Sequence, residues 1–200
     1  MHAEYRAATT KGAATRSRII DRALEMVRIG GFDGLSIGSV AETAAMSKSG
    51  VFAHFGSREE LQLAVLDTAA ERFTREVFVP ALRAPRGLAR LHAIATHWLE
   101  WLRVSEGGCP MVGAAVEFDD RHGPVRERVV FYEERLRAEL VRAVRMAIDT
   151  GELRVDTDAA QVAFELFAIA LASHHDFRLL GDASPRGARA IERLIEFHRV

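Results

Sequence analysis

Small and polar side chains gather in residues 46–61, which read MSKSGVFAHFGSREEL. Val51 and Phe55 lie four residues apart, so on a helix they share a face that can anchor it to a core. The other faces carry Lys48, Ser49, Gly50, Phe52 and His54. A short helix with one apolar anchor and small or polar groups elsewhere fits the major groove of DNA. Gly50 allows a close approach, although glycine inside a helix costs about 1 kcal/mol relative to alanine.

Three residues flanking this helix have the chemistry to bind phosphate. Ser36 and Ser39 begin the preceding helix, where hydroxyls and backbone N–H groups attract anions. Arg58 lies in the first turn of the following helix, against that helix's own dipole, and an anion outside the protein would explain this placement. Each residue alone also fits a solvated helix surface. The predicted DNA-binding surface consists of Ser36, Ser39, Lys48, Ser49, Gly50, Phe52, His54 and Arg58.

Caps and stop signals predict the helices that position these side chains. We expect helices over residues 15–30, 36–44, 47–53 and 57–80. The serine that starts each of the last three is a predicted N-cap, and Glu60 completes a capping box with Ser57. Two short helices joined by a tight turn, after a longer one, are the pattern of a helix-turn-helix.

Helical periodicity continues through the second half of the chain. Apolar stripes run over about 88–102, 125–147, 158–173 and 191–198, with no strand pattern and no internal repeat. The predicted fold class is therefore all-α, with a small N-terminal unit and a larger helical bundle.

Composition and charge narrow the class of protein. The 200 residues carry a net charge of −1, yet residues 1–58 have eight Lys and Arg against five Asp and Glu, so the basic excess lies at the N-terminal end. The single cysteine, Cys109, excludes an internal disulfide and fits a reducing compartment. The polar N-terminus lacks a signal region, and the longest apolar run, 162–172, is too short to span a bilayer. We expect a cytoplasmic protein with a disordered arm over residues 1–14.

The stretch from about Thr15 to Phe73 resembles the DNA-binding domain of the tetracycline-repressor (TetR) family of transcriptional regulators. The resemblance rests on RIIDRALEMVRIGGFDGLSI, on SVAETAAMSKSGVFAHF and on the SREEL that follows. It covers about a third of the chain. It implies a helix-turn-helix domain over residues 15–56 and an all-helical ligand-binding and dimerisation domain over 57–200. The segment GGCPMVGAAVEFDDRHGPVRERV is also similar to many members but assigns no ligand.

Two positions depart from the common pattern of that family. Ala45 stands where many members have glycine in the turn. Phe52 stands where many have an aromatic residue with a hydroxyl that binds phosphate. We therefore expect Phe52 to pack against a sugar or a thymine methyl group.

A ligand site in the second half would need a mostly apolar cavity between helices. The candidate lining residues are His92, Trp98, Trp101, Leu102, Met111, Phe118 and Phe131. Aromatic and methionine side chains at helical spacing also fill ordinary cores, and His92 at the edge of an apolar stripe has the same two interpretations.

Dimerisation is predicted for the last two helices, over about 158–180 and 186–199. The segment 158–173 is apolar on two faces and so needs to be covered twice. The candidate interface residues are Phe164, Phe167, Leu171, His174, Ile191, Leu194 and Ile195. His174 and His175 point about 100° apart on a helix, which disfavours a shared metal ion.

A helical enzyme is the main alternative, because Glu117, Asp119, Asp120, Arg121 and His122 form a charged cluster. Solvated charges at a helix end explain the cluster as well, and the chain has no phosphate-binding loop or metalloprotease motif. Cys109 before Pro110, at a predicted helix N-terminus, has the position of a redox sensor, but no second cysteine is present to form a disulfide with it. We assign no catalytic residue, metal or cofactor. The sequence thus predicts a homodimeric, ligand-responsive repressor that binds a palindromic operator and is released by a small apolar ligand; a constitutive DNA-binding module without ligand is the other alternative.

Overall fold

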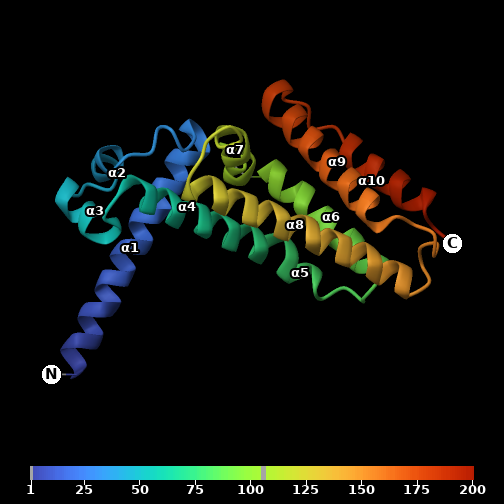
Figure 1. Cartoon of the computed structure of the whole chain (residues 1–200), viewed down its shortest axis with the longest axis horizontal. Coiled ribbons are helices and arrows are strands. Elements are labelled where there is room, and N and C mark those ends of the chain that lie inside the picture. Colours follow the sequence, from blue (N-terminus) through green and yellow to red (C-terminus); the bar gives the residue numbers. More distant parts are fainter. Residues whose placement is uncertain (1, 105–106) are drawn as a thin grey trace. The chain divides into compact units, whose positions relative to one another are not determined.

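The computed structural model describes the backbone of residues 2–104 and 107–200 and the side chains of residues 11–104 and 107–200. Its elements are α1 (His2–Gly30), α2 (Ile37–Thr43), α3 (Lys48–Phe55), α4 (Arg58–Phe73), the π-helix η1 (Thr74–Phe78), α5 (Val79–Ala81), α6 (Leu88–Val104), α7 (Pro110–Glu117), α8 (Pro124–Asp149), α9 (Ala159–Leu180) and α10 (Arg186–Phe197) (Figure 1). The all-α prediction is confirmed. Among the described residues, β pairing is limited to an isolated bridge between Leu153 and Arg199, and no helix is long and apolar enough to cross a membrane.

The chain divides into two compact units. Unit 1 comprises Met1–Ala70 and Cys109–Val129, and unit 2 comprises Glu71–Gly108 and Val130–Val200. Helices α4 and α8 each contribute residues to both units. The predicted boundary between residues 56 and 57 differs from this division, because α7 and the start of α8 pack with the N-terminal helices.

Helix α1 begins at His2, whereas the sequence predicted a disordered arm over residues 1–14. This segment is rich in alanine, which has the highest intrinsic helix propensity, and the small and polar character on which the prediction rested does not prevent a helix from continuing.

The core of unit 1 lies between α1, α2, α3 and α4. Val51 is fully buried and Phe55 is nearly so, as their four-residue spacing predicts. Other fully or almost fully buried side chains of this core are Ile19, Leu24, Phe32, Leu35, Val40, Leu61 and Val65. The two short helices α2 and α3 are therefore fixed on their inner faces, which leaves their outer faces for contacts with a partner.

An aromatic cluster lies in the core of unit 2. The Phe73 ring makes edge contacts with Phe78, Trp98 and Trp101, with centroids 5.9 to 6.1 Å apart. Trp98 also contacts Phe167 of α9 at 5.9 Å. Residues five apart lie about 140° apart on an α-helix, so Phe73 and Phe78 meet only because the intervening turn is a π-helix.

Pro80 explains the π-helix. It has no N–H to donate to the carbonyl of Glu76, and its ring would clash with that carbonyl in an α-helix. The N–H of Val79 instead donates to the carbonyl of Thr74, five residues earlier. The helix predicted to run from Ser57 to about Pro80 thus changes its winding at Thr74.

Candidate nucleic-acid interface

The start of α2 is closed by a reciprocal cap. The hydroxyl of Ser36 accepts from the N–H of Ser39 at 3.0 Å, and the hydroxyl of Ser39 accepts from the N–H of Ser36 at 3.0 Å. The Ser39 hydroxyl also lies within donating distance of the carbonyls of Gly34 and Ser36. Both side chains predicted to bind phosphate therefore already stabilise the helix end, with Ser36 exposed and Ser39 half-buried.

The turn between α2 and α3 contains a residue in the left-handed region. Ala45 has φ 51°, the one positive φ among the described non-glycine residues. Local backbone bonds hold the turn: Met46 N–H donates to Ala41 at 2.9 Å, and Ala45 N–H donates to Glu42 at 3.2 Å. A left-handed conformation costs an L-residue roughly 1–2 kcal/mol, so the position favours glycine.

Helix α3 presents a mixed outer surface. Ser47 is its N-cap and accepts from the N–H of Gly50 at 3.0 Å. Lys48 and Ser49 are exposed, and Phe52 is 55% exposed. Gly50 and His54 are half-buried. Phe52 at the outer face is consistent with the predicted contact to a sugar or a thymine methyl group.

Gly50 is constrained by its own helix cap as well as by any approach to DNA. A Cβ at this position would lie 3.1 Å from the Ser47 hydroxyl, which is tighter than ordinary contact. Gly38 of α2 is similar, because a Cβ there would lie 3.2 Å from Cε of Lys48. The two short helices thus pack closely at glycine.

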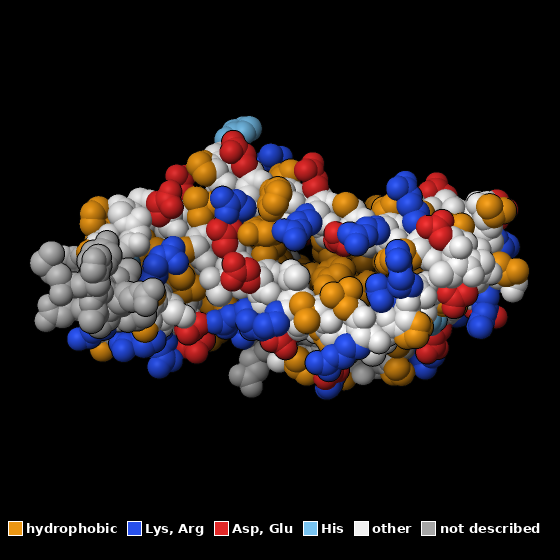
Figure 2. All heavy atoms as spheres, turned by 90° about the horizontal axis from the view of Figure 1, so that it is seen from below, with side chains coloured by type: hydrophobic (Ala, Val, Ile, Leu, Met, Phe, Trp, Pro, Cys, Tyr) orange, Lys and Arg blue, Asp and Glu red, His pale blue; other side chains and the backbone are white. Residues whose placement is uncertain are grey.

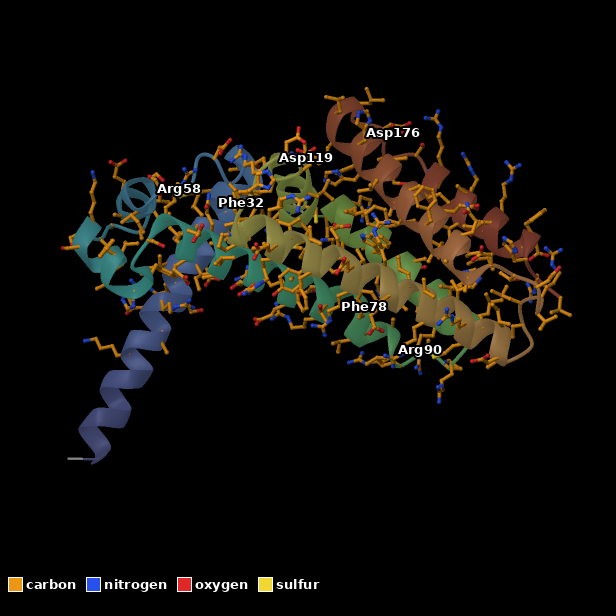
Figure 3. The ribbon with its side chains drawn as sticks, in the orientation of Figure 1. Phe32, Arg58, Phe78, Arg90, Asp119 and Asp176 are labelled. Carbon is orange, nitrogen blue, oxygen red and sulfur yellow. The ribbon has the colours of Figure 1, made fainter. Side chains whose placement is uncertain are left out.

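Arg58 has partners inside the protein. Its Nε donates to the carbonyl of Leu35 at 2.7 Å, and one of its terminal nitrogens donates to the carbonyl of Asp33 at 2.8 Å (Figure 3). The placement of Arg58 against its own helix dipole is therefore explained by the carbonyls of residues 32, 33 and 35. Its contact with DNA stays a prediction.

Two residues near this surface were missed by sequence reasoning. The guanidinium of Arg16, on α1, lies 5.0 Å from the centroid of the Phe55 ring at the end of α3. Gln62, on α4, is buried and donates to the carbonyl of Phe32 at 3.1 Å. The basic excess of residues 1–58 was the one signal that pointed to Arg16.

Charged residues of the cluster at 117–122 are engaged in contacts within the chain. The Glu117 carboxylate accepts from backbone N–H groups of residues 32 and 33, and Arg121 pairs with Asp33. Asp119 accepts from the N–H of Asp120. Over the described part of the chain, no three His, Cys, Asp or Glu side chains are arranged to hold a metal ion. Glu117 and Arg121, from the cluster that suggested an enzyme, thus stabilise the turn at residues 32 and 33.

The predicted ligand-binding residues do not gather in one unit. Met111 and Phe118 belong to unit 1, where the Phe118 ring contacts Phe32 with centroids 5.8 Å apart. His92, Trp98, Trp101, Leu102 and Phe131 belong to unit 2. Trp98, Trp101 and Leu102 are buried in the aromatic cluster or beside it, His92 is half-buried, and Phe131 is 51% exposed.

The predicted interface residues divide between the inside and the outside of unit 2. Phe167, Ile191 and Ile195 are buried against their own chain, while Phe164 is 58% and Leu171 36% exposed. Leu194 and His174 are half-buried. Burial lowers the pKa of the His174 imidazole, and the charges of Arg178 and His175 lower that pKa further. An apolar stripe cannot by itself distinguish packing within a subunit from packing between subunits.

Charge on the surface is mixed in sign. On the face drawn in Figure 2, Lys and Arg side chains alternate with Asp and Glu and with exposed apolar groups. This agrees with the net charge of −1 and directs attention to individual basic residues rather than to a broad basic face.

Family models match most of the chain. Residues 19–65 match the model described as bacterial regulatory proteins, tetR family, and residues 87–193 match the tetracyclin repressor-like, C-terminal domain. No curated protein matches the chain by sequence.

Solved structures of similar fold cover nearly the whole chain. A TetR transcriptional regulator from Chloroflexus aurantiacus J-10-fl has a TM-score of 0.83 and 29% identity over 94% of this chain and 96% of its own. A TetR-family regulator from Cytophaga hutchinsonii has a TM-score of 0.82 and 21% identity over 95% and 97%. AibR, solved in complex with isovaleryl coenzyme A and operator DNA, has a TM-score of 0.70 and 16% identity over 92% and 98%.

Proposed function

Because the chain belongs to the TetR family of transcriptional regulators, we propose that it is a homodimeric repressor that binds a palindromic operator through α3 and leaves it when a small apolar ligand binds. Regulators of this family are non-enzymatic DNA-binding transcription factors, which removes the enzyme alternative. The observation that carries the proposal is the outer surface of α3, with Lys48, Ser49 and Phe52 exposed on a helix whose inner face is fixed by Val51 and Phe55.

DNA binding is tested on a duplex that contains the promoter of the chain's own gene, by mobility shift over a range of salt concentrations. Wild type should bind specifically and more weakly as salt rises. Lys48→Ala should weaken binding similarly on all sequences and lower by about one the slope of the logarithm of affinity against the logarithm of salt concentration. Ser49→Ala should also alter the sequence preference. Arg145→Ala, an exposed basic residue on α8, is the control and should bind as wild type does. Absence of specific, salt-sensitive binding by wild type on this duplex and on selected genomic fragments would refute the proposal.

The homodimer is supported by an unequal distribution of apolar surface on the last two helices. The outer face of α9 exposes Ala160, Phe164, Ala168, Leu171 and Ala172, which follow one another at helical spacing. The outer face of α10 exposes mainly charged side chains, namely Arg189, Glu192, Arg193 and Glu196. We therefore propose that α9 supplies most of the apolar contact in a four-helix bundle with the second copy.

The mass of the protein in solution tests this arrangement. Phe164→Asp should convert a dimer into a monomer, because it places an uncompensated charge in the centre of the apolar face. Val155→Asp replaces an equally apolar and more exposed side chain outside α9, and should stay dimeric. A Phe164→Asp protein that remains a dimer would place the interface elsewhere.

The ligand proposal rests on the aromatic cluster of unit 2 and on two structural relatives that are associated with an acylated and an apolar molecule. AibR was solved with isovaleryl coenzyme A, and KstR2 of Mycobacterium tuberculosis is a ketosteroid transcriptional regulator. Trp98 and Trp101 are the two tryptophans of the chain, so their fluorescence reports on this cluster. Isovaleryl coenzyme A and a steroid panel are the first probes, with fluorescence change and operator release as joint readouts. If a broad set of apolar compounds produces neither, the chain is a constitutive DNA-binding module.

A further inference from the structure

The turn between α1 and α2 is held by side chains from a distant part of unit 1. The N–H of Phe32 donates to Oε1 of Glu117 at 3.0 Å, and the N–H of Asp33 donates to Oε2 at 2.9 Å. One carboxylate thus binds two successive backbone amides, 85 and 84 residues away along the chain. Hydrogen bonds to an ionised carboxylate are stronger than neutral ones.

Gly31 makes this contact possible. Its φ is 70°, in the region that favours glycine, and a Cβ there would overlap the Glu117 carboxylate. A glycine in this conformation followed by two converging N–H groups forms a concave site for an anion. Glu117 fills the site with a negative charge from the same chain.

A second ionic contact links the same two segments. Both terminal nitrogens of Arg121 donate to the Asp33 carboxylate, at 2.7 and 2.6 Å. The Arg121 hydrogen bonds hold the pKa of Asp33 below its usual value, against a smaller opposite effect of desolvation, and the charge of Arg58 adds to the lowering. Arg121 also lies over the Phe118 ring, whose edge contact with Phe32 completes the packing.

The carbonyl side of this turn is held from α4. Arg58 donates to the carbonyls of Leu35 and Asp33, and Gln62 donates to that of Phe32. The turn ends at Ser36, the N-cap of α2. Its position and that of the first turn of α2 are therefore determined jointly by α4 and by the segment 117–121 (Figure 3).

We propose that Glu117 and Arg121 are positioning residues for DNA recognition. They lie outside the 19–65 match to the DNA-binding family model and inside the 87–193 match to the C-terminal one. By fixing residues 31–35 they set where α2 begins, and α2 packs directly on the recognition helix α3. The proposal rests on the proposed DNA-binding function and adds two residues to it that contact no DNA themselves.

A matched control exists in unit 2. Glu152 accepts from the N–H of Leu88 at 2.8 Å, and a Cβ on the preceding Gly87, φ 98°, would overlap its carboxylate. The contact has the same chemistry as the one at Gly31, but it supports the start of α6 instead of the DNA-binding helices. Glu152→Gln keeps one acceptor oxygen for Leu88 and therefore measures what the loss of the carboxylate charge at such a contact does to stability alone.

The test compares operator affinity and amide exchange in Glu117→Gln and Glu152→Gln. Glutamine offers one acceptor oxygen, so one of the two amides of residues 32 and 33 loses its partner. Glu117→Gln should speed hydrogen exchange at these amides and weaken operator binding roughly tenfold, the effect of losing one charge-assisted hydrogen bond. Glu152→Gln should leave operator affinity unchanged at a temperature where both variants are folded. Asp120→Asn removes one negative charge from an exposed neighbour, and so measures how much the change in net charge alone alters operator affinity.

The ion pair gives a second variant that keeps the proposal falsifiable if Glu117→Gln does not fold. An exposed ion pair adds little to global stability, so Arg121→Ala should keep the melting temperature within a few degrees and still weaken operator binding about threefold or more. If wild type binds operator and these variants bind equally well, the positioning role is refuted. If wild type binds no operator, the proposed function itself fails.

Discussion

The loops that precede α2 and α6 are stabilised by the same residue types, namely a glycine, a glutamate and an arginine. Each contains a glycine with positive φ, Gly31 or Gly87, and the next N–H donates to a glutamate distant in sequence, Glu117 or Glu152. In each, an arginine donates to carbonyls of the loop: Arg58 at Leu35 and Asp33, and Arg90 at Ala84.

The loops differ in what they support. Glu152 uses Oε2 alone, accepting from Leu88 and from the Thr150 hydroxyl, and stabilises the N-terminal turn of the long helix α6. Glu117 uses both oxygens, and Arg121 adds an ion pair to Asp33 beside it. The Glu152 contact stabilises the fold. The Glu117 contact stabilises the fold and, in our proposal, also determines the position of the DNA-binding helices. The same local chemistry therefore has a different role in each loop, and the helix that follows the loop determines that role.

The largest effect is expected for alanine at either glycine. Gly31→Ala and Gly87→Ala would each force an unfavourable φ and displace a carboxylate from its amide, for a loss of roughly 2–4 kcal/mol of unfolding free energy. Gly56→Ala is the control, because its φ of 72° is similar but no atom lies within 4 Å of an added Cβ, so about 1 kcal/mol should be lost. Urea denaturation measures all three. Equal losses at the three positions would show that the carboxylates contribute nothing.

The arginines come next. Arg58→Ala and Arg90→Ala each remove hydrogen bonds to loop carbonyls, and each should cost roughly 1–2 kcal/mol of unfolding free energy. Only Arg58→Ala should also weaken operator binding, measured by mobility shift on folded protein. A parallel loss of operator affinity in Arg90→Ala would erase the distinction between the two loops.

The turn at Ala45 has neither a glutamate nor an arginine contact in the described structure, so its backbone strain is not offset by a charged side chain. Ala45→Gly should raise the unfolding free energy by about 0.5–1 kcal/mol, because glycine removes the left-handed strain at some cost in chain entropy. Ala45→Val should lower it. Operator affinity should stay at the wild-type value in Ala45→Gly, since the backbone that glycine adopts is the one already present.

The smallest effect concerns pH. Hydrogen bonds from Arg121 lower the pKa of Asp33, and those from Thr150 and Leu88 lower the pKa of Glu152. A carboxyl group whose pKa is lower in the folded than in the unfolded chain stabilises the fold above its unfolded pKa, near 4, and this contribution is lost as pH falls through the folded value. Urea denaturation between pH 3 and 7 should therefore show a shallower acid loss in Asp33→Asn and in Glu152→Gln than in wild type. An unchanged pH profile in either variant would mean that its carboxylate is not linked to folding.

Local signals in the sequence were sufficient for the helix-turn-helix. Ser36 and Ser47 cap α2 and α3, and the Ser57 hydroxyl accepts from the N–H of Glu60, because a cap depends on residues three positions apart. The hydrogen bonds from the N–H groups of residues 32 and 33 to Glu117 were not predictable, since backbone amides occur in every sequence. The partner of Ser36, which is Ser39 rather than an acidic residue, was also missed.

Helical periodicity identified the apolar faces of the helices but not the elements against which these faces pack. Ile191 and Ile195 were predicted at a subunit interface and are buried in their own chain, whereas Phe164 is exposed. Gly187 explains part of this packing, because its lack of a side chain lets α10 approach Ser173 of α9 very closely. Which of two apolar faces meets the chain itself depends on such contacts between helices, and they have no signature within one helix.

The π-helix at 74–78 is equivalent to one residue inserted into an otherwise regular helix. Each residue of an α-helix turns the chain by about 100°, so one residue fewer in this segment would rotate the preceding helix by that angle relative to Pro80 and bring the Pro80 ring against the carbonyl four residues earlier. Natural variation in length should therefore be rare here and tolerated in the loop that follows, at residues 82–87. In a comparison of homologous sequences, a gap opposite residues 74–78 would mark a protein whose aromatic cluster is built differently.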